Sequence, residues 1–217
     1  MSELLLAGCE CQARLCQNLQ DPPLGRGAWN KLLQKSETRS VFLTWQWLSS
    51  WWECFSDGAT LFTFAVERSG ELVGIAPLMV RRTEGARFVE FLGMGSSDYC
   101  DVIASDDDKA EVVRAVWDAL LKRRDRWDRV RLRYLPSHSS TARHLSALTL
   151  LAGWERRSEV ESSCPALSIE ASPSFAEACT KKKSLVRHTK YFERLAPLEF
   201  HHAMDVDEIL DRLPEFF

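Results

Sequence analysis

The residues with the clearest chemical potential lie in one short segment, from Gly95 to Asp101. Two carboxylates, Asp98 and Asp101, stand three residues apart, and the phenol of Tyr99 lies between them. Carboxylates and a phenol at the edge of a pocket can accept hydrogen bonds from the hydroxyls or the amine of a substrate. The same residue types also form tight turns, in which Asp98 and Ser97 satisfy backbone N–H groups. The segment is therefore a candidate substrate-binding loop, and a purely structural turn is the alternative.

The glycines at the start of this loop suggest a second kind of chemistry. Residues 90–95 read Glu-Phe-Leu-Gly-Met-Gly, with the glycine spacing of the Arg/Gln-x-x-Gly-x-Gly/Ala loop that holds the pyrophosphate in coenzyme-A-dependent acetyltransferases. That loop needs a hydrogen-bond donor at its first position and a helix directly after it. Glu90 is acidic, and the residues after Gly95 have the pattern of a turn and a strand. The glycines therefore predict a turn that connects two strands.

A row of tryptophans forms a third candidate site. The chain contains eight tryptophans, and four of them lie between Trp45 and Trp52. One broad apolar face at helical spacing contains Trp47, Trp51 and Trp52 together with Leu48 and Phe55, and Thr44 is suited to cap that helix. The row could be an aromatic platform for a sugar or a base, with Trp52 as a contact residue. The alternative is a helix that large side chains hold against a sheet.

Other familiar catalytic and metal-binding motifs are absent from the sequence. There is no Gly-x-Ser-x-Gly elbow, no Walker loop, no His-Glu-x-x-His and no pair of CxxC motifs, and the histidines fall on expected surface turns or helices. Asp106, Asp107 and Asp108 precede an expected helix, where negative charge is favourable without a metal ion. The seven cysteines are an odd number, and the group at Cys9–Cys16 lacks a fourth zinc ligand. We expect reduced thiols and no metal.

Composition limits the class of protein. The 217 residues are 45% hydrophobic and 27% charged with a net charge of −3, which describes an ordinary globular chain and no DNA-coating protein. No apolar run approaches the roughly 20 residues of a membrane helix. The segment Leu6–Cys9 has the form of a lipoprotein processing box, but the acidic Glu3 and the short apolar run argue against such a signal. We expect a cytoplasmic protein.

The candidate residues must be positioned by a sheet with helices around it. Four short-linked apolar runs, at 61–66, 72–75, 87–92 and 99–104, predict an antiparallel meander with Gly70 in a positive-φ turn position. Periodicity predicts helices at 29–34, 44–55, 109–122 and 140–151, and strands at 127–134 and 154–169. The expected fold class is α+β, with a mostly antiparallel mixed sheet flanked by helices.

The pattern changes at Ser172. Residues 181–195 form an expected basic amphipathic helix, in which Lys181, Lys183 and Arg187 could meet an anionic donor or precursor. A solvated helix that joins two domains is the alternative. A strand at 197–202 and a last helix capped by Asp205 or Asp207 follow. We expect an irregular segment at 1–28, a domain at 29–171, and the start of an incomplete second domain at 172–217.

Four motifs occur in a recognisable order. They are Phe42-Leu43-Thr44-x-x-Trp47-Leu48-x-x-Trp51-Trp52, the segment Gly70–Leu78, Gly95-x-x-Asp98-Tyr99-x-Asp101, and the basic helix Lys183–Leu195. This order resembles the N-terminal half of the cellulose-biosynthesis acyltransferase family (CelD/BcsL type) of the GNAT superfamily and, more distantly, the Fem-type aminoacyl transferases.

The resemblance implies a tandem pair of GNAT-like domains in the bacterial cytoplasm, of which this chain holds the first. It implies acetyl-CoA or another acyl-CoA as donor, and an exopolysaccharide or cell-envelope precursor as the acceptor of N- or O-acylation. The residues that we nominate for the acceptor are Asp98, Tyr99, Asp101 and Trp52, and those for the donor are Lys181, Lys183 and Arg187. A non-catalytic GNAT-like binding domain and an aminoacyl-tRNA-dependent transferase are the alternatives.

Overall fold

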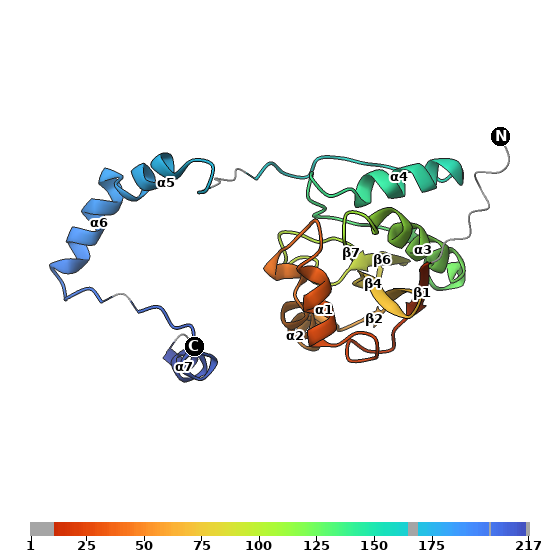
Figure 1. Ribbon diagram of the computed structural model, residues 1–217, viewed down its shortest axis with the longest axis horizontal. Coiled ribbons are helices and arrows are strands. Elements are labelled where there is room, and N and C mark those ends of the chain that lie inside the picture. The colour runs from red at the N-terminus through yellow and green to blue at the C-terminus, as the bar shows by residue number, and fades with distance from the viewer. Residues whose placement is uncertain (1–10, 165–168, 200, 216–217) are drawn as a thin grey trace. The chain divides into compact units, whose positions relative to one another are not determined.

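The computed structural model describes residues 11–164, 169–199 and 201–215 (Figure 1). The chain divides into two compact units, Met1–Glu161 and Ser162–Phe217. The segment Leu6–Cys9, which has the form of a lipoprotein processing box, lies outside the described residues.

Unit 1 contains two four-stranded sheets. The first sheet is antiparallel throughout and has the order β1 (Cys11–Leu15), β3 (Phe64–Arg68), β4 (Glu71–Ala76), β7 (Ile103–Ala104). The second has the order β2 (Ala59–Leu61), β5 (Leu78–Thr83), β6 (Ala86–Phe91), β8 (Arg129–Val130), and its β6–β8 pair is parallel. Only Pro77 separates β4 from β5, and proline has no N–H group for a strand ladder. One extended stretch of chain therefore passes through both sheets.

Two tight hairpins set the register of these strands. The β3–β4 turn places Ser69 and Gly70 at φ values of 51° and 81°, and the β5–β6 turn places Glu84 and Gly85 at 53° and 80°. Positive φ at both central residues is the type I′ geometry that matches the twist of paired strands. The predicted turn position of Gly70 is confirmed.

Helices cover unit 1 in two groups (Figure 1). The helices of this unit are α1 (Arg26–Leu33), α2 (Trp45–Phe55), α3 (Lys109–Leu121) and α4 (Thr141–Leu151). One apolar cluster joins α1 and α2 to one side of the strands, through Trp29, Leu48 and Ile75. The other joins α3 to the opposite side, through Phe64 and Val112. The predicted α+β fold class and the predicted helices of this unit are confirmed.

Helix α3 lies unusually close to β4. A Cβ atom on Gly74 would overlap with Cγ1 of Val112, closer than any normal contact between carbon atoms. Glycine is therefore required at this position because no side chain fits between the strand and the helix.

Several predicted elements differ in the structure. Strand β7 pairs with β4 and not with β6, so the four predicted strands do not form one meander. Strand β1 forms within the segment that we expected to be irregular, and the predicted strand 127–134 is regular only at Arg129–Val130. Residues 154–164 and the described part of 197–202 are not strands, while 165–168 and Phe200 lie outside the described residues. Asp108 stands at the N-cap of α3, but its carboxylate contacts Ser105 and Arg68 and caps no helical N–H group.

Unit 2 consists of the helices α5 (Pro173–Thr180), α6 (Lys183–Glu193) and α7 (Val206–Arg212) in its described part. The Asp205 carboxylate accepts hydrogen bonds from the N–H groups of Asp207 and Glu208, at 3.0 and 3.3 Å, and caps α7 as predicted. The expected basic helix is α6. Its apolar side chains, including Leu185 and Phe192, are about half exposed.

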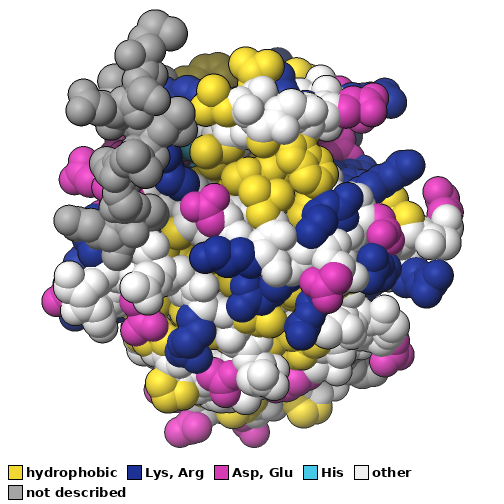
Figure 2. All heavy atoms as spheres, turned by 90° about the vertical axis from the view of Figure 1, so that its right-hand side faces the viewer, with side chains coloured by type: hydrophobic (Ala, Val, Ile, Leu, Met, Phe, Trp, Pro, Cys, Tyr) yellow, Lys and Arg dark blue, Asp and Glu magenta, His cyan; other side chains and the backbone are white. Residues whose placement is uncertain are grey.

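The surface is mixed in character. On the face seen in Figure 2, Lys and Arg side chains alternate with Asp and Glu around apolar patches. In the described part of the chain, no helix combines the length and the apolar character that crossing a bilayer requires.

Candidate functional site

The loop after β6 is held in place by α2. The indole Nε1 of Trp47 donates to the hydroxyl of Ser97 at 2.9 Å, and Nε1 of Trp51 donates to the hydroxyl of Ser96 at 3.2 Å. Trp51 is also largely buried in the apolar cluster beneath α2. The two hydrogen bonds hold the loop against α2. Trp51 also packs in one cluster with Ile75 and Met79 of the strands, as the structural alternative for this row predicted.

The same loop is poorly suited to a pyrophosphate group. Gly93 and Gly95 have φ values of 80° and 93°, and a Cβ on Gly93 would lie 2.5 Å from the Ser97 Oγ. The N–H of Ser96 donates to the Gly93 carbonyl, so it turns inward. The next helix begins only at Lys109, after three aspartates. The loop therefore has no helix directly after it, in agreement with the predicted strand-connecting turn.

Tyr99 and Asp98 lie at the surface of this loop. The ring centroid of Tyr99 is 6.5 Å from that of Phe42, which in turn meets Trp47 edge to face at 5.1 Å. Tyr99 is 37% exposed, so this aromatic group is open to a ligand on one side. Trp52 is partly buried against the apolar cluster beneath α2. The structure thus adds Phe42 to the nominated residues and places Trp52 mainly in packing.

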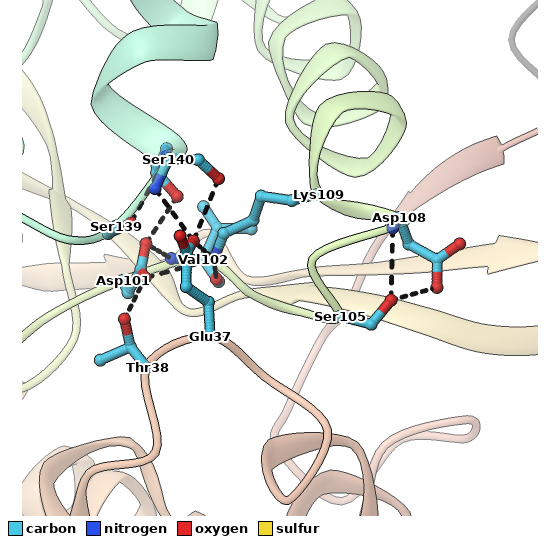
Figure 3. A network of polar contacts seen from close by, with 10 residues as sticks. Glu37, Thr38, Asp101, Val102, Ser105, Asp108, Lys109, Ser139 and Ser140 are labelled. Atoms are coloured by element: carbon cyan, nitrogen blue, oxygen red, sulfur yellow. Dashed lines mark hydrogen bonds and ion pairs between the residues drawn. The ribbon is translucent and has the colours of Figure 1, made fainter.

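Asp101 has a different environment from Asp98. Its side chain is fully buried, and its carboxylate accepts hydrogen bonds from the hydroxyls of Thr38 at 2.7 Å and Thr141 at 2.6 Å (Figure 3). The ammonium of Lys109, also fully buried, lies 3.2 Å from it, and the N–H of Val102 donates to it at 2.8 Å. Both carboxylate oxygens of Asp101 therefore accept hydrogen bonds from groups of the protein itself. Of the nominated residues, Asp101 therefore lies in a buried network and not at the surface of the loop.

The buried network continues to Glu37. Its carboxylate lies 4.0 Å from the Lys109 ammonium and accepts hydrogen bonds from the N–H and the hydroxyl of Ser140, at 2.9 and 3.0 Å. Lys109 also donates to the carbonyl of Val102. Figure 3 shows these groups converging from the start of α3, the start of α4 and two loops. The network fixes the end of the candidate loop relative to both helices.

A carboxylate with an unused oxygen lies at the end of the β6–β8 pair. The Glu90 side chain is fully buried, its Oε1 accepts from the Arg131 guanidinium at 2.7 Å, and its Oε2 has no hydrogen-bond partner among the described residues. Parallel pairing ends here: the N–H of Arg131 donates to the Val89 carbonyl, but the Tyr134 carbonyl accepts from Cys100. A buried carboxylate oxygen without a donor is costly, and such groups often mark a site of ligand binding or proton transfer.

Glu90 shares its sheet face with other polar groups. Register pairing places Met79 opposite Glu90 and Arg81 opposite Phe88, so these four side chains point to the same side. The Arg81 guanidinium stacks on Trp51 at 5.8 Å, and its Nε is also buried without a partner. This face therefore carries both a carboxylate oxygen and a guanidinium N–H that the described residues leave unsatisfied.

In the sequence, Glu90 counts only as evidence against a phosphate loop. The signal that could have identified it is a single acidic residue inside the apolar run Phe88–Leu92, on a strand expected to be half buried. A charge in such a position needs a partner or a function.

The nominated cationic residues lie at the end of α5 and on α6: Lys181 is the C-cap of α5, and Lys183 and Arg187 belong to α6. Lys181, Lys183 and Arg187 line one open pocket of about 380 Å³, together with Lys190 and Arg194. Lys183, Arg187, Lys190 and Arg194 follow one another at spacings of four, three and four, so they form one stripe along the helix. The Glu177 carboxylate pairs with Lys181 at 2.5 Å. The stripe is an exposed, positively charged surface of unit 2.

The ionisable groups near the loop are adjusted by burial. Burial, followed by the neighbouring charge of Asp101, raises the pKa of the Cys100 thiol to about 12, so this thiol stays protonated at neutral pH. At α3, burial opposes ionisation of Asp108, but hydrogen bonds from Ser105 and Arg68 outweigh it and lower the pKa of that carboxyl. Among the described residues, no group of three or more His, Cys, Asp or Glu side chains is placed to hold a metal ion.

Comparison with known proteins gives only distant similarities. No protein-family model matches the chain, and no curated protein matches its sequence. A point mutant of TTHA1254 from Thermus thermophilus aligns with 72% of this chain and 98% of its own, at 16% identity and a TM-score of 0.40. A ribosomal-protein-alanine N-acetyltransferase from Brucella melitensis biovar Abortus 2308 aligns with 72% of this chain and 99% of its own, at 15% identity and a TM-score of 0.42.

Proposed function

We propose that the chain is part of a GNAT-like acyltransferase, in which Glu90 accepts a proton from the acceptor while the acyl group is transferred directly from a coenzyme A thioester. The observation that carries this proposal is the Glu90 carboxylate, which is buried, held by Arg131 through Oε1 and left without a donor at Oε2. The order of the sequence motifs supports the reaction class.

An amine or hydroxyl must lose a proton when it attacks a carbonyl carbon. The side chain of Glu90 is suited to take that proton because Arg131 fixes its orientation through Oε1, while the buried Oε2 has no hydrogen-bond partner among the described residues. Arg131 is itself stacked on Phe88 at 4.4 Å, so the pair is held from two sides. When bound, an acyl-CoA supplies the thioester carbonyl. No nucleophile of the protein is required, because positioning of the two substrates suffices.

The acceptor that we propose is a saccharide or cell-envelope precursor with a reactive amine or hydroxyl. The exposed Tyr99 and the half-buried Phe42 offer an aromatic surface of the kind on which a sugar ring packs, and the exposed Asp98 can accept its hydroxyl hydrogens. Asp101 would act indirectly, because its buried carboxylate holds the end of this loop in position.

The phosphates of the donor are best matched by α6. The loop after β6 in unit 1 is closed and followed by acidic residues, whereas Lys181, Lys183 and Arg187 present exposed positive charge around a single pocket. We propose that these residues bind the phosphates. The donor and the acceptor proposals rest on different residues, so each is tested by its own variants.

The binding test is isothermal titration of acetyl-CoA into the full chain. We expect measurable binding, and we expect the triple substitution of Lys181, Lys183 and Arg187 by alanine to weaken it by about tenfold or more. Lys31→Ala, at an exposed position on α1, is the matched control and should change nothing. Absence of any heat with the unchanged protein would contradict the coenzyme A proposal.

The catalytic test compares Glu90→Gln with the unchanged protein in a thiol-release assay with amine and hydroxyl sugars as acceptors. Glutamine keeps the shape but removes the proton acceptor, so the rate should fall by roughly 10²- to 10⁴-fold while acetyl-CoA binding is retained. Equal rates would exclude Glu90 as the proton acceptor.

A non-catalytic binding domain is the second candidate. The loop after β6 and the three aspartates before α3 favour it, because no helix directly follows this loop to hold a donor's phosphates. Sugar binding without acetyl-CoA binding in the same titrations would support this alternative.

A further inference from the structure

A second pocket lies at one end of the sheet that contains β2, β5, β6 and β8. It has a volume of about 350 Å³, and it is bounded by residues of β2, β5 and β6 and by the short turn Arg124–Arg126. Phe62 and Val80 supply apolar lining, while Arg82 and Arg126 line it with charge. The volume falls within the usual range of small-ligand sites.

The charges at this pocket are not balanced. Arg82 and Arg87 are direct register partners on β5 and β6, so two like charges stand opposite each other, an arrangement that is unfavourable by itself. Asp128 neutralises Arg87 through contacts of 2.9 and 3.1 Å. For the guanidinium groups of Arg82 and Arg126, in contrast, the described residues provide neither a hydrogen bond nor an ion pair. Against these two cations the pocket holds one carboxylate, that of Asp125.

This pocket is separate from the face that carries Glu90. Thr60 pairs with Val80, and Arg82 pairs with Arg87, so these side chains share one side of the sheet. Side chains alternate along a strand, and Glu90 differs from Arg87 by an odd number of positions. Glu90 therefore points to the opposite side of the sheet, and a ligand of this pocket is distinct from an acceptor that would reach Glu90.

We propose that this pocket binds a small organic anion, with a carboxylate or a phosphate as its charged group and an apolar body. The planar guanidinium groups of Arg82 and Arg126 are suited to paired hydrogen bonds with either oxyanion. Phe62 and Val80 would contact the apolar body, which inorganic anions lack. The ligand is an addition to the proposed acyl transfer and does not depend on it.

The test uses benzoate, phenyl phosphate and inorganic phosphate as probes, titrated into the full chain and followed by the amide NMR signals of Gly58 and Thr60. We expect at least one organic anion to bind and inorganic phosphate to bind about tenfold more weakly or not at all, because it makes no apolar contact. The comparison of benzoate with phenyl phosphate identifies the preferred charged group. Equal affinity for inorganic phosphate, or no binding of either organic anion, would overturn the proposal.

Substitutions at the pocket can distinguish the contribution of its charges from that of its shape to anion binding. Arg82→Gln and Arg126→Gln should each weaken binding by about tenfold, and Val80→Trp should block it by filling the space while both cations remain. Arg129→Gln is the matched control, since Arg129 lies over Phe88 on the opposite side of the sheet. Unchanged affinity in both arginine variants, or an equal loss in the control, would exclude this pocket as the site. Binding by Glu90→Gln should be normal, so failure of the catalytic proposal leaves this result unaffected.

Discussion

The Asp101 carboxylate and the Lys109 ammonium form an ion pair at 3.2 Å in which both side chains are completely removed from solvent. Two buried charges are stable in this position because each has further partners: Thr38 and Thr141 donate to Asp101, and the Val102 carbonyl accepts from Lys109. The pair joins the end of the candidate loop to the first turn of α3. The conformation of the candidate loop therefore depends on this ion pair.

Removal of one partner of this pair should destabilise the protein strongly. Asp101→Ala leaves the Lys109 ammonium buried beside only the distant Glu37 carboxylate, so the free energy of unfolding should fall by about 3–5 kcal/mol. Urea unfolding followed by tryptophan fluorescence measures this change. Lys122→Met, at the exposed end of the same helix, is the control and should shift stability by less than about 0.5 kcal/mol. A loss below about 1 kcal/mol for Asp101→Ala would show that the pair is not buried as described.

The Trp47–Ser97 hydrogen bond should control the order of the candidate loop. Trp47→Phe keeps an aromatic ring but leaves the buried Ser97 hydroxyl without its donor, which should cost about 1–2 kcal/mol. Hydrogen exchange at residues 95–98 should become faster. A double-mutant cycle with Ser97→Ala isolates the interaction, and additive effects in that cycle would argue against the bond.

The close approach of α3 to β4 makes a prediction at Gly74. Gly74→Ala places a methyl group against Val112, so stability should fall by about 1–3 kcal/mol. Val112→Ala in the same chain should recover part of the loss by making room. The control is Gly27→Ala in α1, which meets no atom within 4 Å and should be neutral or stabilising by up to about 1 kcal/mol. Thermal unfolding distinguishes these outcomes.

The raised pKa of Cys100 predicts both reactivity and alkaline stability. With a thiol pKa of about 12, Cys100 should resist iodoacetamide at pH 8, whereas the exposed Cys54 should react, and peptide mass mapping can compare them. The unfolded thiol ionises near its ordinary pKa of about 8.5, so the folded state binds the extra proton above that pH and stability falls as pH rises toward 12. Cys100→Ala should flatten this part of the stability profile, and an unchanged slope would contradict the assignment.

Local signals in the sequence identified most helices and hairpins. Thr44 precedes an apolar face and caps α2. Gly70 lies between two apolar runs and adopts the positive φ of a hairpin turn. Both preferences are local, so both elements were predictable. Partner choice was not predictable from local signals. β7 has only two paired residues, and its pairing with β4 depends on long-range packing. Strand β1 was missed because small residues, Cys11 and Ala13, supply two of the three positions on its more buried side, so the alternation of apolar and polar residues is weak.

The sequence predicted where the candidate site lies better than it predicted what each of its residues does. The segment around Asp98 and Tyr99 was identified from residue types, and both side chains do reach the surface. Asp101 is buried, whereas Asp98, of the same residue type, is exposed. The hydrogen-bond partners of Asp101 include Thr38 and Thr141, which are far from it in the sequence. Glu90 was missed because one unpaired oxygen is a property of three-dimensional packing. Spacing alone cannot separate these cases.

Strand β1 has a practical consequence for any shortened version of this protein. A product that started at Trp29, where the apolar pattern first becomes regular, would lack the five residues that pair with β3 from Cys11 to Leu15. The backbone N–H and C=O groups along that side of β3 would then form an exposed sheet edge, which promotes self-association through added strands. Truncation at the apparent domain start would therefore yield an aggregating product, whereas retention of residue 11 onward would keep the edge covered.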